Sequence, residues 1–149
     1  MMSKLEQIRS IAQRVRSRVL EHRHNLDVDI DLGGACAIAS VALVRVLKRE
    51  GIDATLVLGQ YRNALGNHCW VLVGSRIVDL TATQYHATVE VVRIVSQSEP
   101  DYEAHHYGSD AMKYVQAWSR GPHVHAATID RIVFEAEAFV DETRDRERP

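Results

Sequence analysis

The sequence predicts one α+β domain, in which a cysteine-bearing helix packs on a small antiparallel sheet and further helices flank this core. Three observations support this class. Helical periodicity comes first along the chain, short apolar runs bounded by glycines fill the middle, and helical periodicity returns near the end. A chain of 149 residues suffices for one substantial core, and no repeat or linker divides it. We therefore expect residues 1–149 to form a single domain, with its core over about residues 25–98.

The first third of the chain contains two predicted helices. Residues 4–23 have apolar side chains at three- and four-residue steps with charges between them, which is typical of an amphipathic helix. A polar, acidic connection over residues 25–34 ends in Gly33-Gly34. Residues 36–50 are apolar almost all round, so we expect this second helix to be buried. Gly51 is expected to cap its C-terminus.

The middle of the chain shows the shorter period of a sheet. Residues 54–58 form an apolar run bounded by Gly59, and residues 88–95 are rich in β-branched side chains. Residues 68–73 and 76–81 are two further strand-like runs. Only Gly74-Ser75 separates them, a pair suited to a tight two-residue hairpin turn. Strands are therefore predicted over these four segments.

The last third is predicted to begin as a loop and to end in helices. Residues 96–108 are polar without a clear period, which favours a loop. Helices are expected over residues 110–119 and about 129–140. The charged residues 141–149 are expected to fray, as chain ends often do.

Composition excludes several classes of protein. The formal net charge is -2, with 18 Lys and Arg against 20 Asp and Glu, so no strong field favours nucleic acid or an anionic membrane. The first twenty residues mix apolar positions with arginines, which argues against a secretory signal. No apolar run approaches the roughly 18 residues that span a bilayer. With two cysteines and no sign of an oxidising compartment, we expect a soluble, cytoplasmic protein with free thiols.

The setting of Cys36 marks it as a candidate nucleophile. It follows Gly33-Gly34 and begins a predicted helix, where unpaired N–H groups and the positive end of the helix dipole stabilise an anion. Thiolate is the reactive form of cysteine, and a helix N-terminus is one of the places that lowers its pKa. The same N–H groups suit an oxyanion formed during acyl transfer. The competing interpretation is a small buried hydrophobe, the commonest role of a free cysteine.

A histidine and an acid are predicted to share one face of the hairpin. If a two-residue turn joins the strands, His68 pairs with Thr81, and Asp79 lies diagonally beside His68. Diagonal neighbours are about 7–8 Å apart at the backbone, within reach of an imidazole–carboxylate hydrogen bond. A three-residue turn would place Asp79 on the other face. Asp79 also lies within the apolar run of residues 77–80, where an unpaired charge would be unfavourable.

These positions suggest roles for the side chains around the hairpin. Cys36 is the candidate nucleophile, His68 takes its proton and later protonates the leaving group, and Asp79 orients the imidazole. Cys69 points away from the His68 face in a regular strand, so we expect it in the core. Trp70 is on the His68 face, where it either shields the imidazole–carboxylate bond or is a core residue.

Two further sets of polar residues are weaker candidates. Three amides are possible oxyanion or positioning groups, although solvated or backbone-bonded amides are commoner: Gln60, Asn67 and Gln84. A second set of residues offers a competing metal centre: His105, His106, His123 and His125 with Asp101, Glu103 and Asp110. No ligand spacing fixes a geometry for them, so a histidine-rich polar loop is the alternative. We expect no metal and no cofactor.

An ordered set of short motifs resembles the transglutaminase-like core. The motifs are Gly34-Ala35-Cys36 at a helix start, Gly51-Ile52-Asp53-Ala54 at a helix-to-strand junction, Asn67-His68-Cys69-Trp70-Val71, and Val78-Asp79-Leu80-Thr81. They span about residues 33–83, and their layout is also similar to that of the leader peptidases of lasso-peptide biosynthesis. The resemblance implies a papain-like fold and a triad of Cys36, His68 and Asp79. Two departures are visible, because the second and fourth motifs lack the family's proline and no tryptophan precedes Cys36.

The leading functional hypothesis is thiol-dependent hydrolysis or acyl transfer at an amide bond of a peptide or protein substrate. A peptidase, an amidase, a glutamine deamidase and a transglutaminase all fit this chemistry. Hydrolysis is favoured over cross-linking because it needs no second amine pocket. The alternative is a catalytically inactive binding or maturation module that keeps the transglutaminase-like core as a scaffold. No oligomeric state follows from these residues.

Overall fold

The computed structural model describes residues 2–28, 34–62, 64, 66–84, 91–116, 118 and 121–147. Within these residues the chain is an α+β fold, as predicted, with five helices and one five-stranded antiparallel sheet. The helices are α1 (Lys4–Glu21), α2 (Arg23–Leu26), α3 (Cys36–Arg49), α4 (Gly108–Val115) and α5 (Ala126–Glu147). The strands are β1 (Thr55–Tyr61), β2 (His68–Val73), β3 (Arg76–Asp79), β4 (Arg93–Ser96) and β5 (Tyr102–Tyr107), and a 3-10 turn covers Ala82–Gln84.

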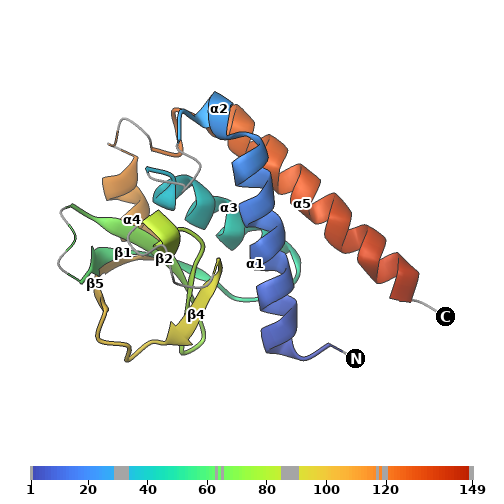
Figure 1. Cartoon of the computed structure of the whole chain (residues 1–149), viewed down its shortest axis with the longest axis horizontal. Helices are drawn as coiled ribbons and strands as arrows, with labels where there is room; N and C mark the ends of the chain where they lie inside the picture. The colour runs from blue at the N-terminus through green and yellow to red at the C-terminus, as the bar shows by residue number, and fades with distance from the viewer. Residues whose placement is uncertain are drawn as a thin grey trace.

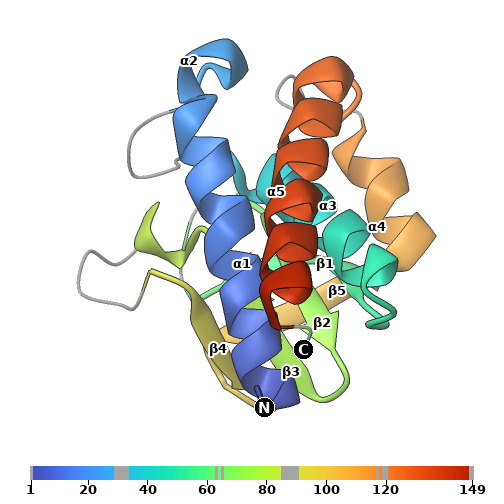
Figure 2. The same ribbon diagram turned by 90° about the vertical axis from the view of Figure 1, so that its right-hand side faces the viewer.

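The helix α3 lies between the sheet and the other long helices. It packs on β1 and β2 on one side and on α1 and α5 on the other. Figure 2 shows α1 and α5 running side by side across this layer. Because α3 is covered on both sides, its nearly all-apolar surface is buried, which confirms the prediction made from its sequence. No helix in the described ranges is long and apolar enough to cross a membrane.

The sheet has the order β4-β3-β2-β1-β5. Figure 1 shows its edge strands β4 and β5 on the opposite side of α1 from α5. Its hairpin β2–β3 turns at Gly74-Ser75, and Val73 pairs with Arg76. The two-residue turn is therefore confirmed. In this register Val71 pairs with Val78, so both point to one face of the sheet. Because side chains alternate along a strand, His68 and Asp79 both point to the other face.

The sheet is curved, as shown by contacts between residues at its two edge strands. Arg93 of β4 lies 3.2 Å from Asp101, the residue before β5, measured from Nη2 to Oδ2. Its guanidinium also lies over the Tyr102 ring of β5, 5.4 Å from the ring centroid. The face enclosed by this curve, here called the concave face, carries an apolar and aromatic cluster of Val57, Tyr61, Trp70, Ile77 and Tyr102. The opposite face, here called the helix face, packs on α3.

Gly59 allows β5 to approach β1 closely. The pairing of β1 with β5 shifts register between Leu58 and Gly59. A Cβ atom at Gly59 would collide with the backbone carbonyl oxygen of Glu103 and would lie 2.7 Å from the Trp70 ring. A side chain at this position would therefore push apart the strand and the indole that close the concave face.

The structure corrects the predicted boundaries after residue 58. The predicted strand over residues 54–58 extends to Tyr61. The loop predicted over residues 96–108 is wrong for residues 102–107, because Tyr102–Tyr107 forms β5. This edge strand is mostly exposed and polar, so pairing with β1, and not apolar alternation, determines it. The strand predicted over 88–95 is observed at Arg93–Ser96, while residues 88–90 lie outside the described residues.

The last helices also differ in length from the prediction. The helix predicted over residues 110–119 is α4, which begins earlier, at Gly108, and ends at Val115. The helix predicted over about 129–140 is α5, which covers Ala126–Glu147. Its last turns include most of the charged residues that were expected to fray, so that prediction is wrong for residues 141–147. Charged side chains do not prevent a helix from continuing when its apolar stripe is already packed.

Candidate active site

Cys36 is the first residue of α3. It follows Ala35 at the N-cap and Gly34, whose φ of 85° is a left-handed conformation that glycine adopts without strain. The first N–H groups of a helix have no intrahelical acceptor, so the backbone around the Cys36 side chain presents donors and the positive end of the helix dipole. The side chain is buried, with 6% of its surface exposed. The sequence therefore placed Cys36 correctly.

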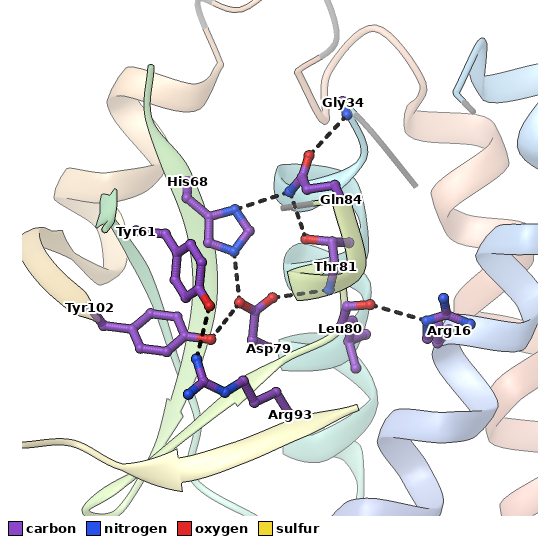
Figure 3. Close-up of polar contacts among 10 residues, drawn as sticks. All are labelled: Arg16, Gly34, Tyr61, His68, Asp79, Leu80, Thr81, Gln84, Arg93 and Tyr102. Carbon is purple, nitrogen blue, oxygen red and sulfur yellow. Dashed lines mark hydrogen bonds and ion pairs between the residues drawn. The ribbon is translucent and has the colours of Figure 1, made fainter. Parts of the chain in front are cut away.

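His68 and Asp79 form a fully buried hydrogen-bonded pair (Figure 3). His68 Nε2 lies 2.8 Å from Asp79 Oδ2, and neither side chain is exposed to solvent. The other carboxylate oxygen, Oδ1, accepts the backbone N–H of Thr81 at 3.0 Å. Oδ2 also accepts the hydroxyl of Tyr102 at 2.8 Å. Since a carboxylate carries only acceptors, three donors make its burial tolerable.

Aromatic rings surround this pair on the concave face. Trp70 is almost completely buried, and its ring centroid lies 5.9 Å from that of His68. The Tyr61 ring lies 6.0 Å from His68 on another side. Arg93 donates to the Tyr61 hydroxyl at 3.2 Å. Trp70 is thus both a core residue and a shield, and exclusion of water strengthens the imidazole–carboxylate interaction.

Gln84 joins the imidazole to the start of α3. Its Nε2 lies 3.2 Å from His68 Nδ1, and its Oε1 accepts the backbone N–H of Gly34 at 3.4 Å. The same Nε2 donates to Thr81 Oγ1 at 3.3 Å (Figure 3). Arg16 of α1 supports this segment through a hydrogen bond to the Leu80 carbonyl at 3.2 Å. Of the three amides considered from the sequence, Gln84 is therefore the one that reaches the imidazole.

The other two amides lie elsewhere. Gln60 donates to the backbone carbonyl of Ala64 at 3.3 Å, and Asn67 is exposed. Both therefore fit the commoner roles of an amide, bonded to backbone or to solvent.

The thiol of Cys36 lies in hydrogen-bonding contact with two neighbours, Cys69 and His68. A hydrogen bond from Cys69 lowers the pKa of Cys36 most, and the hydrogen bond and charge of His68 lower it further. Burial acts in the opposite direction but is outweighed, so the pKa of Cys36 lies well below its ordinary value. Hydrogen bonding to Cys36 and burial both raise the pKa of Cys69. The directions of these two pKa shifts favour ionisation of Cys36 over ionisation of Cys69.

His68 and Asp79 are shifted in the directions expected for an ion pair. Burial acts to lower the pKa of His68, but the charge and hydrogen bond of Asp79, followed by those of Cys36, raise it to about 10. Burial likewise acts to raise the pKa of Asp79, but the charge and hydrogen bond of His68 lower it below the ordinary value. The N–H of Thr81 and the hydroxyl of Tyr102 add to this lowering. The arrangement therefore favours Cys36 as a thiolate, His68 as an imidazolium and Asp79 as a carboxylate.

Cys69 has the core position expected from the sequence, and it also lies near Cys36. It is fully buried on the helix face, away from the cluster that contains Trp70, as predicted. It is nevertheless a neighbour of the candidate nucleophile, because Cys36 comes from α3 and lies in the same cluster as Cys69. The two faces of β2 therefore both reach Cys36, one through His68 and the other through Cys69.

The residues of the competing metal site have other contacts. His106 Nδ1 lies 2.7 Å from Asp110 Oδ2, and His105 Nε2 lies 3.3 Å from Glu103 Oε1. Asp101 instead accepts hydrogen bonds from Arg62 and Arg93. Among the residues that the structure describes, no three imidazoles, thiols or carboxylates form a group that could hold a metal ion. The prediction of a metal-free protein remains a prediction.

Sequence reasoning missed the residues that support Asp79 from the edges of the sheet. Tyr102 lies in a segment predicted to be a loop, and Arg93 lies in a strand whose partners were unknown. One signal was present: a carboxylate inside an apolar run needs donors beyond a single imidazole. That signal predicts that further hydrogen-bond donors exist, but it does not indicate which distant segment supplies them.

The α+β fold is consistent with a transglutaminase-like core, which belongs to a family of the general cysteine hydrolase and acyltransferase type. Residues 2–94 match the family model of the transglutaminase-like superfamily, and this match spans Cys36, His68 and Asp79. The chain belongs to the transglutaminase-like superfamily, whose members are typically enzymes. No curated protein and no solved structure matches the chain significantly. The matched region ends before β5, so the strand that carries Tyr102 lies outside it.

Proposed function

We propose that this protein is a thiol-dependent hydrolase or acyltransferase that acts on an amide bond of a peptide or protein through Cys36, His68 and Asp79. The observation that carries the proposal is the buried pair of His68 Nε2 and Asp79 Oδ2, 2.8 Å apart, with Cys36 in hydrogen-bonding contact with the same imidazole. A buried ion pair contributes little to stability compared with apolar packing, so its presence next to a thiol favours a functional role.

The chemistry follows from the positions of the three groups. His68 Nδ1 takes the proton of the Cys36 thiol, and the thiolate attacks the carbonyl carbon of the amide. The C–S bond forms as the carbonyl π bond opens to an oxyanion, which then collapses with cleavage of the C–N bond. The imidazolium gives its proton to the departing amine. Water, activated by the neutral imidazole, then cleaves the thioester and restores the thiol.

Two further features support hydrolysis in a reducing compartment. Both cysteines are free, and oxidation of Cys36 would remove the nucleophile, so the proposal suits a cytoplasmic protein. Hydrolysis also needs only a peptide or protein substrate and water, whereas cross-linking needs a site for a second amine. Within the class we therefore favour a peptidase or a glutamine deamidase.

The test is the pH dependence of Cys36 alkylation by iodoacetamide, followed by mass spectrometry that separates Cys36 from Cys69. We expect the Cys36 rate in the wild type to titrate with a midpoint well below the ordinary thiol value of about 8.5. His68→Ala should raise this midpoint, because the imidazolium that stabilises the thiolate is gone. Cys69 is the internal control, since its raised pKa should leave it unlabelled.

A positive result then justifies a screen with glutamine-based and peptide-based electrophilic probes. Covalent labelling should disappear in Cys36→Ala and His68→Ala, and the preferred probe would report the substrate class. An ordinary Cys36 midpoint near 8.5 that does not change in His68→Ala would contradict the proposal. The non-catalytic binding or maturation module would then be the better interpretation.

A further inference from the structure

Gln84 contacts the nitrogen that has to receive the proton of Cys36. His68 Nε2 is engaged by Asp79, so Nδ1 is the nitrogen left for the thiol, and Gln84 Nε2 lies 3.2 Å from it. The amide is half-buried, and it is the most exposed side chain of the group that includes Cys36, His68 and Asp79. It therefore lies where a substrate carbonyl would arrive from solvent.

The orientation of the Gln84 amide follows from its backbone partner. Gly34 N–H can only donate, so the amide atom facing it at 3.4 Å must be the acceptor Oε1. The NH2 group then faces His68 Nδ1 and Thr81 Oγ1, at 3.2 and 3.3 Å. An NH2 group can donate to Nδ1 only while that nitrogen carries a lone pair, which requires a neutral imidazole.

Proton transfer from Cys36 to His68 ends this hydrogen bond. Once Nδ1 is protonated it becomes a donor, and two donors 3.2 Å apart no longer attract each other. The Gln84 N–H is thus released in the same step that creates the thiolate. It remains beside Gly34, two residues before the nucleophile, because its Oε1 is still held by the Gly34 N–H.

We infer that Gln84 is a further catalytic residue, which donates to His68 Nδ1 while the imidazole is neutral and to the oxyanion while that nitrogen is protonated. This inference rests on the proposed function. In the reaction, the released N–H binds the oxygen that gains the electron pair of the carbonyl π bond. When the oxyanion collapses and His68 gives its proton to the leaving amine, the Nδ1 lone pair returns and accepts the Gln84 N–H again. The donor is thus free whenever Nδ1 is protonated, which includes the stage at which negative charge is present on the oxygen.

Two reactions of the same thiol separate this role from mere support of the site. Acylation by p-nitrophenyl acetate passes through an oxyanion and releases p-nitrophenolate. Alkylation by iodoacetamide displaces iodide at a saturated carbon and forms no oxyanion. The experiment measures both rates at Cys36 in the wild type, Gln84→Ala and Gln84→Glu. The glutamate variant keeps the shape of the side chain but loses the NH2 donor, so it remains informative if the alanine variant folds poorly.

We expect acylation to slow by about 10²-fold in both variants, the effect of removing one oxyanion donor. Alkylation should be at least as fast as in the wild type, because the hydrogen bond that favours the neutral imidazole has been removed. Gln60→Glu is the matched control and should change neither rate, since the Gln60 amide donates to the Ala64 backbone. Wild-type acylation rates in the Gln84 variants would overturn the inference. So would a proportional fall of both rates, which would reduce Gln84 to a structural support.

These outcomes differ from those that would remove the proposed function itself. If wild-type Cys36 is neither acylated rapidly nor alkylated in a His68-dependent way, the enzyme proposal fails, and the role of Gln84 fails with it. If the wild type reacts and depends on His68, but the Gln84 variants acylate normally, only the inference about Gln84 is wrong.

Discussion

The helix face and the concave face of the sheet supply the candidate site with different chemistry. On the helix face, Cys36 and Cys69 lie in an apolar cluster with residues of α3, β1 and α4. On the concave face, the His68–Asp79 pair is surrounded by aromatic rings and held by the hydroxyl of Tyr102. The two thiols thus lie among apolar neighbours, while the charged pair of His68 and Asp79 lies on the other face of the sheet.

This difference explains how a buried cysteine obtains a low pKa. Apolar surroundings alone raise the pKa of a thiol, and burial acts in that direction on Cys36. The concave face supplies an imidazolium stabilised by a buried carboxylate, and the helix face supplies a second thiol as a hydrogen-bond donor. If this division is correct, variants of the residues that support His68 on the concave face should lower the acylation rate most, and the variant of Cys69 on the helix face should lower it least.

The largest effect is expected for Asp79→Asn on the concave face. The amide keeps the shape of the carboxylate, but its NH2 group can donate, which favours the wrong tautomer of His68. We expect acylation by an activated ester to fall by about 10⁴-fold, as for the corresponding change in other triads. Circular dichroism should show a folded protein. An acylation rate close to that of the wild type would separate Asp79 from the function and break the comparison between the faces.

The next largest effect concerns how the free energy of unfolding depends on pH, and it involves residues of both faces. The pKa of His68 rises from 6.5 to about 10 on folding, so its stabilisation is complete below pH 6.5 and is lost as pH rises towards 10. The lowered pKa of Cys36 acts in the opposite direction, because its stabilisation is lost as pH falls. Between about pH 6.5 and 8.5 the folded pair and the unfolded pair each hold one proton, so these terms cancel in the wild type.

Cys36→Ala removes this cancellation. The folded variant still holds the His68 proton between about pH 6.5 and 8.5, and the unfolded chain holds none, so its free energy of unfolding should fall with pH. The slope should reach at most about 1.4 kcal/mol per pH unit relative to the wild type. Asp79 is ionised in both states there and adds no slope. Urea unfolding at several pH values measures the difference, and parallel curves for the two proteins would contradict an ion pair of Cys36 and His68.

Tyr102→Phe tests the donor that reaches Asp79 from the edge strand β5. The variant removes a 2.8 Å hydrogen bond to a buried carboxylate and leaves the ring in place. We expect the free energy of unfolding to fall by about 1–3 kcal/mol, with a smaller loss of acylation rate than in Asp79→Asn. Tyr107→Phe is the matched control, because Tyr107 belongs to the same strand but is 47% exposed. Equal stabilities of the two variants would show that the hydroxyl of Tyr102 contributes nothing to the site.

The smallest effect on the acylation rate is expected on the helix face, for Cys69→Ala, and the main change should be in the pKa of Cys36. Removing the second thiol should raise the pKa of Cys36, because the hydrogen bond that lowers it most is gone. Cys69→Ser keeps a donor and should restore part of the shift. The cavity should lower the free energy of unfolding by about 1 kcal/mol, as for other small deletions. The alkylation midpoint of Cys36 measures the shift, and an unchanged midpoint would mean that the concave face sets the reactivity alone.

The parts of the site that follow from local pattern were predictable from the sequence. The all-apolar helix after two glycines placed Cys36 at a helix start, and the two-residue turn at Gly74-Ser75 fixed the register of β2 and β3. With that register, the period of two along a strand brings His68 and Asp79 to one face. These inferences depend only on neighbours in the chain, whose geometry is set by backbone stereochemistry.

What the sequence left open depends on packing between distant segments. The period of a strand places Cys69 on the helix face, but only the packing of α3 shows that Cys36 meets it there. Tyr102 and Gln84 reach His68 and Asp79 because the sheet curves and because a 3-10 turn follows β3. A sequence period determines the face on which a side chain lies. The tertiary structure determines which other side chains it contacts on that face, because these contacts depend on the packing of elements that are distant in the sequence.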